Sequence, residues 1–451
     1  MHFAALCLVI LRLLVGTNGA APPYMDRYPV ANLWNVEADL FKYINSTSNQ
    51  CVQKVRGSAD GSFQHRLSET QCSYYCLSNL PWFNEVESPE DPASYMDEAE
   101  YTSFKKLCAC RDLQNCIPLD GSEVSWRKKR QAQTPALRKE YRMMSDDERT
   151  RFHVAVNQLK SDAGQLISYD TFVEMHQADR APGAHFGASF LPWHREYMRL
   201  FESVLRAIDP HIAIPYFDST LDDPLPTPRH SIMWSEEFMG NGNGEVVTGP
   251  FANWMATDGQ KLNRATGRSG AGSLFRPSDI KYILSRPDFA HLTECVDPFF
   301  ETVHGAVHSW IGGQMSVIQY SPNDPVFWLH HAFIDKIWET YRQTRQTPEE
   351  RETSYPTGNA TCTPAHRAEA RMLPFTIRNI DGLSNEYTRI FYKYHNSPTC
   401  SHANPVCGSP YIFCDTRTYR CISKVVKGGD CAGYEGLDIC HKSNCVNGKC
   451  S

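Results

Sequence analysis

Residues 323–335 read NDPVFWLHHAFID, an apolar stretch with two adjacent histidines that closes with an aspartate. Its aromatic and aliphatic side chains predict a helix that packs in the protein core. Adjacent helical residues point about 100° apart, so His330 and His331 cannot both face one metal ion easily. We expect His331 to be a metal ligand and His330 to line the pocket or support a ligand. Asp335, one turn later, is expected to accept a hydrogen bond from a ligand imidazole.

Five further histidines complete two sets of three. His304 and His308, in HGAVH, are four residues apart, so on a helix they lie on one face. A single buried histidine is more often a hydrogen-bonded core residue, whereas two sets of three favour a metal site with open coordination positions. Imidazole ligands suit zinc, copper, iron and nickel, and spacing alone leaves copper and zinc both open. The two candidate ligand sets are His176, His185 and His194, and His304, His308 and His331.

The segments around these histidines have helical patterns. Residues 145–160 start with Ser145 as a candidate N-cap, followed by acidic residues in the first turn. Residues 192–209 start with Pro192 and then carry apolar residues with a period of about 3.6. With further helices in 168–179, 297–310 and 323–338, the sequence predicts a mainly α fold. Short strands are expected only near 212–216 and 375–380.

The cysteines predict disulfide-stabilised flanks around this helical segment. Of 17 cysteines, one lies in the first 20 residues, six lie in 51–116, two in the middle of the chain and eight in 400–450. Even groups indicate disulfide frameworks in an exported chain. Cys295 and Cys362 are expected to pair because they have no other neighbours, whereas pairing within the large groups stays open.

Several features indicate export. Residues 1–20 are apolar and short, with small residues after them, as in a secretory signal; a membrane anchor is the alternative. Asn45 and Asn359 stand in glycosylation sequons. The basic run in 127–130 predicts a processing site in a linker, with a solvated charge run as the alternative. Its residues are Arg127, Lys128, Lys129 and Arg130.

These patterns divide the chain into four parts. Residues 1–20 are the expected signal peptide, and 21–130 form a Cys-rich, loop-rich segment that could be removed as a propeptide. Residues 131–394 form the helical metal-binding domain, and 395–451 form a second Cys-rich module. The net charge of −6 gives no basic surface for nucleic acid, and no later stretch is apolar enough to span a membrane. We therefore expect neither nucleic acid nor membrane partners.

Two blocks carry a family resemblance. HFGASFLPWHREYMRLFE, residues 185–202, resembles the first copper motif of tyrosinases and catechol oxidases. HGAVHSWIGG, residues 304–313, with NDPVFWLHHAFIDKIW, residues 323–338, resembles the second. The similarity covers about residues 138–393. It implies a four-helix bundle that holds two copper ions, each bound by one histidine set, with O2 as co-substrate for the oxidation of phenols. In this family the second histidine of the HH pair is the ligand, which agrees with His331.

The resemblance also implies a role and some limits. The flanks are similar to those of secreted invertebrate tyrosinases, including mollusc shell-matrix proteins, which implies quinone production that cross-links or pigments a matrix such as shell or cuticle. Partners would be small phenols or the tyrosine and DOPA side chains of matrix proteins. No cysteine lies between Cys116 and Cys295 for the thioether that some members form. Gly305 stands where many monophenol-oxidising members have asparagine, so diphenol oxidation is expected above monophenol oxidation. A haemocyanin-like O2 carrier and a structural matrix protein are the alternatives.

Overall fold

The computed structural model describes residues 91–109, 134–161, 167–268 and 272–451, all within one compact unit, Ser78–Ser451. The expected signal peptide, Asn45 and the basic run 127–130 lie outside these residues. In the described part of the chain, no helix is both long and apolar enough to cross a membrane. The boundaries expected at residues 20, 130 and 394 stay predictions.

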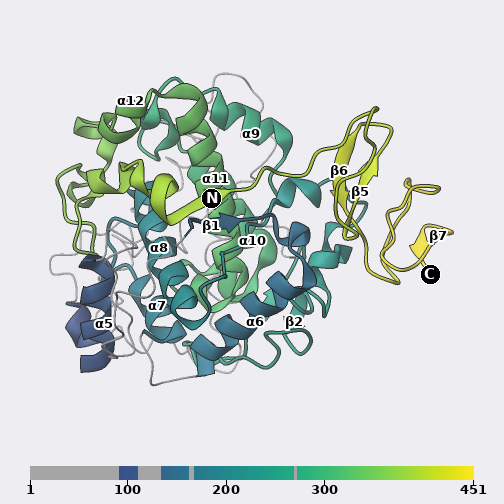
Figure 1. Ribbon diagram of the computed structural model, residues 1–451, viewed down its shortest axis with the longest axis horizontal. Helices are drawn as coiled ribbons and strands as arrows, with labels where there is room; N and C mark the ends of the chain where they lie inside the picture. The colour runs from purple at the N-terminus through teal and green to yellow at the C-terminus, as the bar shows by residue number, and fades with distance from the viewer. Residues whose placement is uncertain (1–90, 110–133, 162–166, 269–271) are drawn as a thin grey trace, which may run out of the picture. The chain divides into compact units, whose positions relative to one another are not determined.

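The expected helices form and confirm a mainly helical fold. They are α6 (Asp146–Ser161), α7 (Tyr169–Met175), α8 (Phe190–Ile208), α10 (Phe299–Ile311) and α11 (Val326–Arg345). Ser145 caps α6 as expected: its hydroxyl accepts from the Glu148 N–H, and the Glu148 carboxylate accepts from the Ser145 N–H. The helices α8 and α11 lie side by side (Figure 1). Between them the rings of Phe201 and Trp328 stack with centroids 3.6 Å apart. The four-helix bundle stays a prediction.

Shorter elements surround these helices. The remaining α-helices in the described ranges are α5 (Glu98–Ala109), α9 (Pro277–Leu284) and α12 (Pro348–Thr353). Short 3₁₀ turns are η2 (Pro92–Ser94), η3 (Tyr141–Met143), η4 (Ser219–Leu221), η5 (Pro228–His230), η6 (Ile232–Trp234), η7 (Phe289–Leu292), η8 (Gly313–Ser316), η9 (Ile318–Asn323), η10 (Gly358–Thr361), η11 (Pro364–His366) and η12 (Asn379–Leu383). A π-helical turn, η13, spans Tyr387–Phe391.

The strands lie elsewhere than the sequence predicts. The strands β1 (Ala136–Arg138) and β4 (Tyr392–Tyr394) pair in parallel, and β2 (Asn243–Glu245) pairs antiparallel with β3 (Asn263–Ala265). The prediction for 212–216 is wrong, since only an isolated bridge joins Tyr216 to Glu140. Pro215 has no N–H, and the Ile214 N–H donates to the Glu202 carboxylate at 2.8 Å, so neither can extend a ladder. Near 375–380 there is likewise only the bridge Arg371–Arg378.

Disulfides hold the C-terminal end of the chain. The expected Cys295–Cys362 bond is confirmed. In the tail, β5 (Ile412–Asp415) pairs with β6 (Arg420–Ser423), and β7 (Cys445–Val446) pairs with β8 (Lys449–Cys450). The tail disulfides are Cys400–Cys414, Cys407–Cys421, Cys431–Cys445 and Cys440–Cys450. Val425 packs with Leu225 in one small core and forms a bridge with Ser231, so the tail rests on the segment that follows α8.

Candidate metal centre

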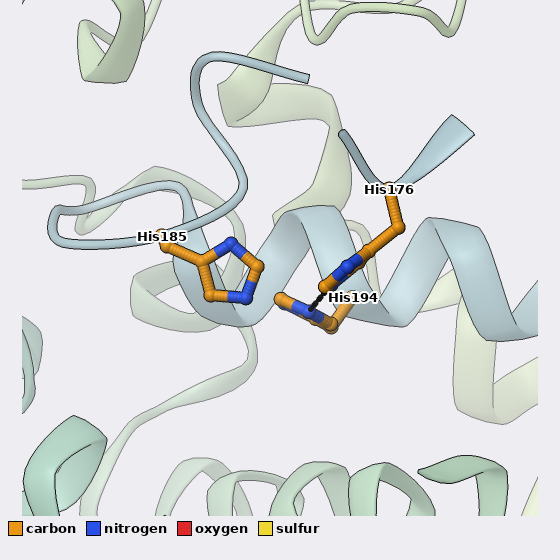
Figure 2. A group of neighbouring side chains, drawn as sticks. All are labelled: His176, His185 and His194. Carbon is orange, nitrogen blue, oxygen red and sulfur yellow. Dashed lines mark hydrogen bonds between the residues drawn. The ribbon is translucent and has the colours of Figure 1, made fainter. Parts of the chain in front are cut away.

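The first histidine set converges although its members come from different elements. His176 caps the C-terminal end of α7, His194 lies in the first turns of α8, and His185 comes from the loop between them (Figure 2). The ring centroid of His185 lies 4.7 Å from that of His176 and 4.9 Å from that of His194. The Nε2 atoms of His176 and His194 are 3.2 Å apart. All three side chains are buried.

The second set converges more tightly. His304 and His308 lie one turn apart on α10, and His331 reaches them from α11. The Nε2 of His308 lies 2.9 Å from that of His304 and 3.1 Å from that of His331. The Nε2 atoms of His304 and His331 are 3.2 Å apart. Three nitrogens at this spacing can surround a single ion.

His330 also lies close to this set, and the geometry separates its role from that of His331. The ligand-type nitrogens of His304, His308 and His330 all lie within 4.8 Å of one another. However, the His330 Nε2 bonds to the His304 carbonyl oxygen at 3.2 Å, and its ring stacks on the His304 ring at 5°. Because the two rings are parallel, the His330 nitrogen lone pairs cannot point at the same metal position as the His304 Nε2 lone pair. His331 makes the closer approach, so we favour it as the ligand.

The two sets face each other, and aromatic side chains surround them. The rings of His194 and His331 stack with centroids 4.2 Å apart. Phe190 packs 4.9 Å from His304 and 5.0 Å from His194, and Phe327 packs 4.1 Å from His331, all between ring centroids. Apolar rings therefore form part of the surroundings of both sets.

The hydrogen bonds on the far side of the rings determine which nitrogen carries the proton. A carbonyl oxygen can only accept, so an imidazole nitrogen bonded to it must be an N–H. Four Nδ1 atoms have such partners: His176 with Ile318, His194 with Phe190, His304 with Glu301 and His308 with Met315, at 2.9–3.2 Å. Their Nε2 lone pairs therefore point at one another with no proton between them. This repulsive arrangement is relieved by a cation, so the donor set fits a metal ion.

Burial keeps these imidazoles neutral, as metal ligands must be. Desolvation lowers the pKa of His194 to about 3 and that of His308 to about 4. It also moves the pKa values of the other four members well below the ordinary value, with neighbouring histidines adding to the effect. These are His176, His185, His304 and His331.

The expected role of Asp335 is wrong. Its carboxylate turns to α8, where Oδ1 accepts from the Arg195 Nε at 2.7 Å, and Oδ2 accepts from the hydroxyls of Tyr392 and Tyr394. The Nδ1 of His331 has no hydrogen-bond partner among the described residues. A guanidinium attracts a buried carboxylate more strongly than a neutral imidazole N–H does. Asp335 therefore joins α11 to α8 instead of orienting a ligand.

The other candidate residues are placed as follows. Gly305 is buried on α10 directly after His304, and Asn359 is exposed in η10. Sequence reasoning missed Glu301, whose carboxylate accepts from the Phe186 N–H at 2.6 Å, next to His185. It also missed His366, which contacts the loop that carries His185. Neither residue stands in a histidine pattern, so no spacing signal could reveal it.

Comparison with known proteins identifies the family. The family model for the common central domain of tyrosinase matches residues 167–344, which contain all six candidate ligands. Tyrosinase-like protein 2 of Margaritifera margaritifera is 31% identical over 83% of this chain and 86% of its own length. The chain belongs to the tyrosinase family. The expectation of a copper pair as cofactor, with O2 as co-substrate, is thereby confirmed.

Other tyrosinase relatives differ in how much of their length is matched. A tyrosinase-like protein of Caenorhabditis elegans is 42% identical over 70% of this chain. The present chain spans only 47% of that relative. Among solved structures, a polyphenol oxidase from Thermothelomyces thermophila aligns with a TM-score of 0.45 and 20% identity, over 69% of this chain and 99% of its own.

Proposed function

We propose that this chain is a secreted phenol oxidase that uses O2 to convert o-diphenols to o-quinones. The observation that carries the proposal is the pair of facing imidazole sets. In each set two Nε2 lone pairs, those of His176 and His194 and those of His304 and His308, meet without a proton between them. The proposed ligands of the first copper are His176, His185 and His194, and those of the second are His304, His308 and His331.

Bound copper ions would supply O2 binding and electron transfer, so that two diphenols and one O2 give two quinones and two waters. The protein contributes the geometry. Backbone carbonyls hold four of the rings by their Nδ1–H groups, which fixes both tautomer and direction. Phe190 and Phe327 form part of the apolar surroundings of both sets. His330 supports the second set by stacking on His304 and bonding its carbonyl oxygen.

The proposed place of action is outside the cell. Five disulfides among the described residues fit an oxidising compartment, and the exposed Asn359 is accessible to a glycosyltransferase. The proposed substrates are small phenols, or tyrosine and DOPA side chains of matrix proteins. Incubation with a DOPA-containing peptide tests this role, because quinone formation followed by peptide cross-linking is expected.

The central experiment combines metal analysis with a catechol assay on the purified full chain. We expect two copper ions per chain and the appearance of quinone absorbance under O2. Reversible O2 binding without quinone would instead indicate an O2 carrier. A chain that binds no copper would indicate a structural matrix protein.

A further inference from the structure

His185 is the one proposed ligand whose position depends on a loop alone. We call residues 181–189 the His185 loop; its residues have no regular helical or strand conformation. Directly after the histidine, Phe186 adopts a φ of 63°, in the left-handed region that residues with a Cβ rarely occupy. Such a conformation persists only where surrounding contacts enforce it. The loop therefore needs an outside support.

A later part of the chain provides this support by close packing. The turn η11, Pro364–His366, lies against the His185 loop. A Cβ on Gly187 would lie 2.5 Å from the His366 ring, and a Cβ on Gly183 would lie 3.1 Å from the Ala365 carbonyl oxygen. At Gly187 only glycine allows so close an approach, and at Gly183 a Cβ would make a tighter contact than usual. The His366 ring thus rests directly on the loop backbone two residues after the ligand.

Hydrogen bonds connect the same ring to His185 and to the end of the loop that follows it. The Ser189 N–H donates to the His366 Nδ1 at 3.3 Å, and the Ser189 Oγ lies 2.7 Å from that nitrogen. The His366 side chain also hydrogen-bonds the backbone of His185 itself. One imidazole therefore connects the ligand residue to the first residues of α8.

The supporting turn is itself fixed. The Tyr355 hydroxyl donates to the His366 carbonyl oxygen at 2.9 Å, and the Asn379 side-chain amide donates to that of Ala365 at 2.8 Å. Four residues before His366, Cys362 is bonded to Cys295 in the segment that leads into α10. With His366 only 2% exposed, this is a rigid, buried support.

We propose that His366 is a positioning residue that aims His185 at the first copper ion by holding the loop backbone at His185 and in the residues that follow it. The inference rests on the proposed function, because it takes His185 to be a copper ligand. Loss of a partner that orients a metal ligand typically weakens metal binding about 10- to 100-fold.

The test compares His366→Ala with His153→Ala in the full chain. Both substitutions remove a buried imidazole, but His153 lies on α6 and packs against Tyr141 and Phe251. The readouts are copper ions per chain and the rate of copper loss to EDTA, with far-UV circular dichroism as a check of folding. We expect His366→Ala to lose one of two copper ions about 10- to 100-fold faster than the wild type. His153→Ala should stay within about twofold of it.

A second pair of variants tests the packing and remains informative if His366→Ala folds poorly. Gly187→Ala alone should speed copper loss, because its new methyl group collides with the His366 ring. In the double variant Gly187→Ala/His366→Ala the methyl group has room, so it should add less than about a twofold effect. Equal effects of Gly187→Ala in both backgrounds would overturn the role of the ring.

The outcomes separate the two proposals. A wild type with two copper ions whose loss rate is unchanged by His366→Ala overturns this inference alone. A wild type that binds fewer than two copper ions overturns the proposed function, and the inference falls with it.

Discussion

The rings of His194 and His331 lie within 11° of parallel, with centroids 4.2 Å apart, although they belong to different histidine sets. The next residue on α8, Arg195, pairs with Asp335 one turn along α11 at 2.7 Å. The stacked rings and the buried ion pair therefore connect the same two helices at neighbouring levels. The register of α8 against α11 decides whether the two metal positions face each other.

The first prediction concerns the HH pair. His331→Gln should reduce bound copper to about one ion per chain, because its Nε2 lies 3.1–3.2 Å from those of His308 and His304. His330→Gln should keep two ions, since its Nε2 bonds the His304 carbonyl oxygen and does not face the other two Nε2 atoms. Metal analysis of both variants, after removal of loosely bound copper, provides the measurement. Retention of two ions by His331→Gln and one by His330→Gln would reverse the assignment.

The second prediction concerns the buried pair between the helices. Asp335→Ala removes a buried carboxylate that bonds Arg195 and two tyrosine hydroxyls, while Arg195 keeps the Glu339 carboxylate as a second partner. The variant should therefore lower the free energy of unfolding by about 3 kcal/mol, the lower end of the cost of breaking a buried pair. Denaturant unfolding of the copper-free protein measures this without a contribution from the metal. Glu245→Ala is the control: that carboxylate pairs with Lys261 at 3.0 Å and both side chains are about half exposed, so a loss of about 1 kcal/mol or less is expected. Similar losses for both variants would refute the role of the buried pair.

Sequence reasoning was successful where the signal is local. His304 and His308 are spaced i,i+4, and the apolar residues of α8 repeat with the helical period. Both patterns can be recognised within a short stretch of sequence. The role of Asp335 was misjudged because its partner, Arg195, comes from a helix far away in the sequence. His366 was missed for a similar reason, since a single histidine in an irregular segment has no period. Contacts between distant segments determine such roles, and the spacing along the chain does not record them.

The third prediction concerns substrate class. A phenol has a pKa near 10, so a monophenol is protonated at pH 7 and needs a base or an activated water to lose its proton. Gly305, next to His304 on α10, has no side chain that could hold such a water. We expect the wild type to oxidise a diphenol at least about tenfold faster than the matching monophenol, and Gly305→Asn to raise the monophenol rate by up to about 100-fold. Initial rates with both substrates, normalised to bound copper, measure this. Rapid monophenol oxidation by the wild type would contradict it.

The fourth prediction concerns pH and His153 on α6. Burial, with a smaller contribution from the Arg149 charge, lowers the pKa of this imidazole to about 3. An unfolded chain takes up the proton near pH 6.5, whereas the folded chain stays neutral until about pH 3. Stability that is fully present above pH 6.5 is therefore lost as the pH falls through this window. The slope approaches about 1.4 kcal/mol per pH unit for this one group.

His153→Gln removes this proton uptake and keeps a polar partner for the Tyr141 hydroxyl, which lies 2.5 Å from the His153 Nε2. In the copper-free protein, the free energy of unfolding should fall less steeply for the variant than for the wild type between pH 6 and 4. The two slopes should differ by about 1.4 kcal/mol per pH unit. Both proteins keep the six proposed ligand histidines, so their contribution cancels in the comparison. Parallel stability curves would mean that His153 is already protonated in the folded protein, against the effect of its burial.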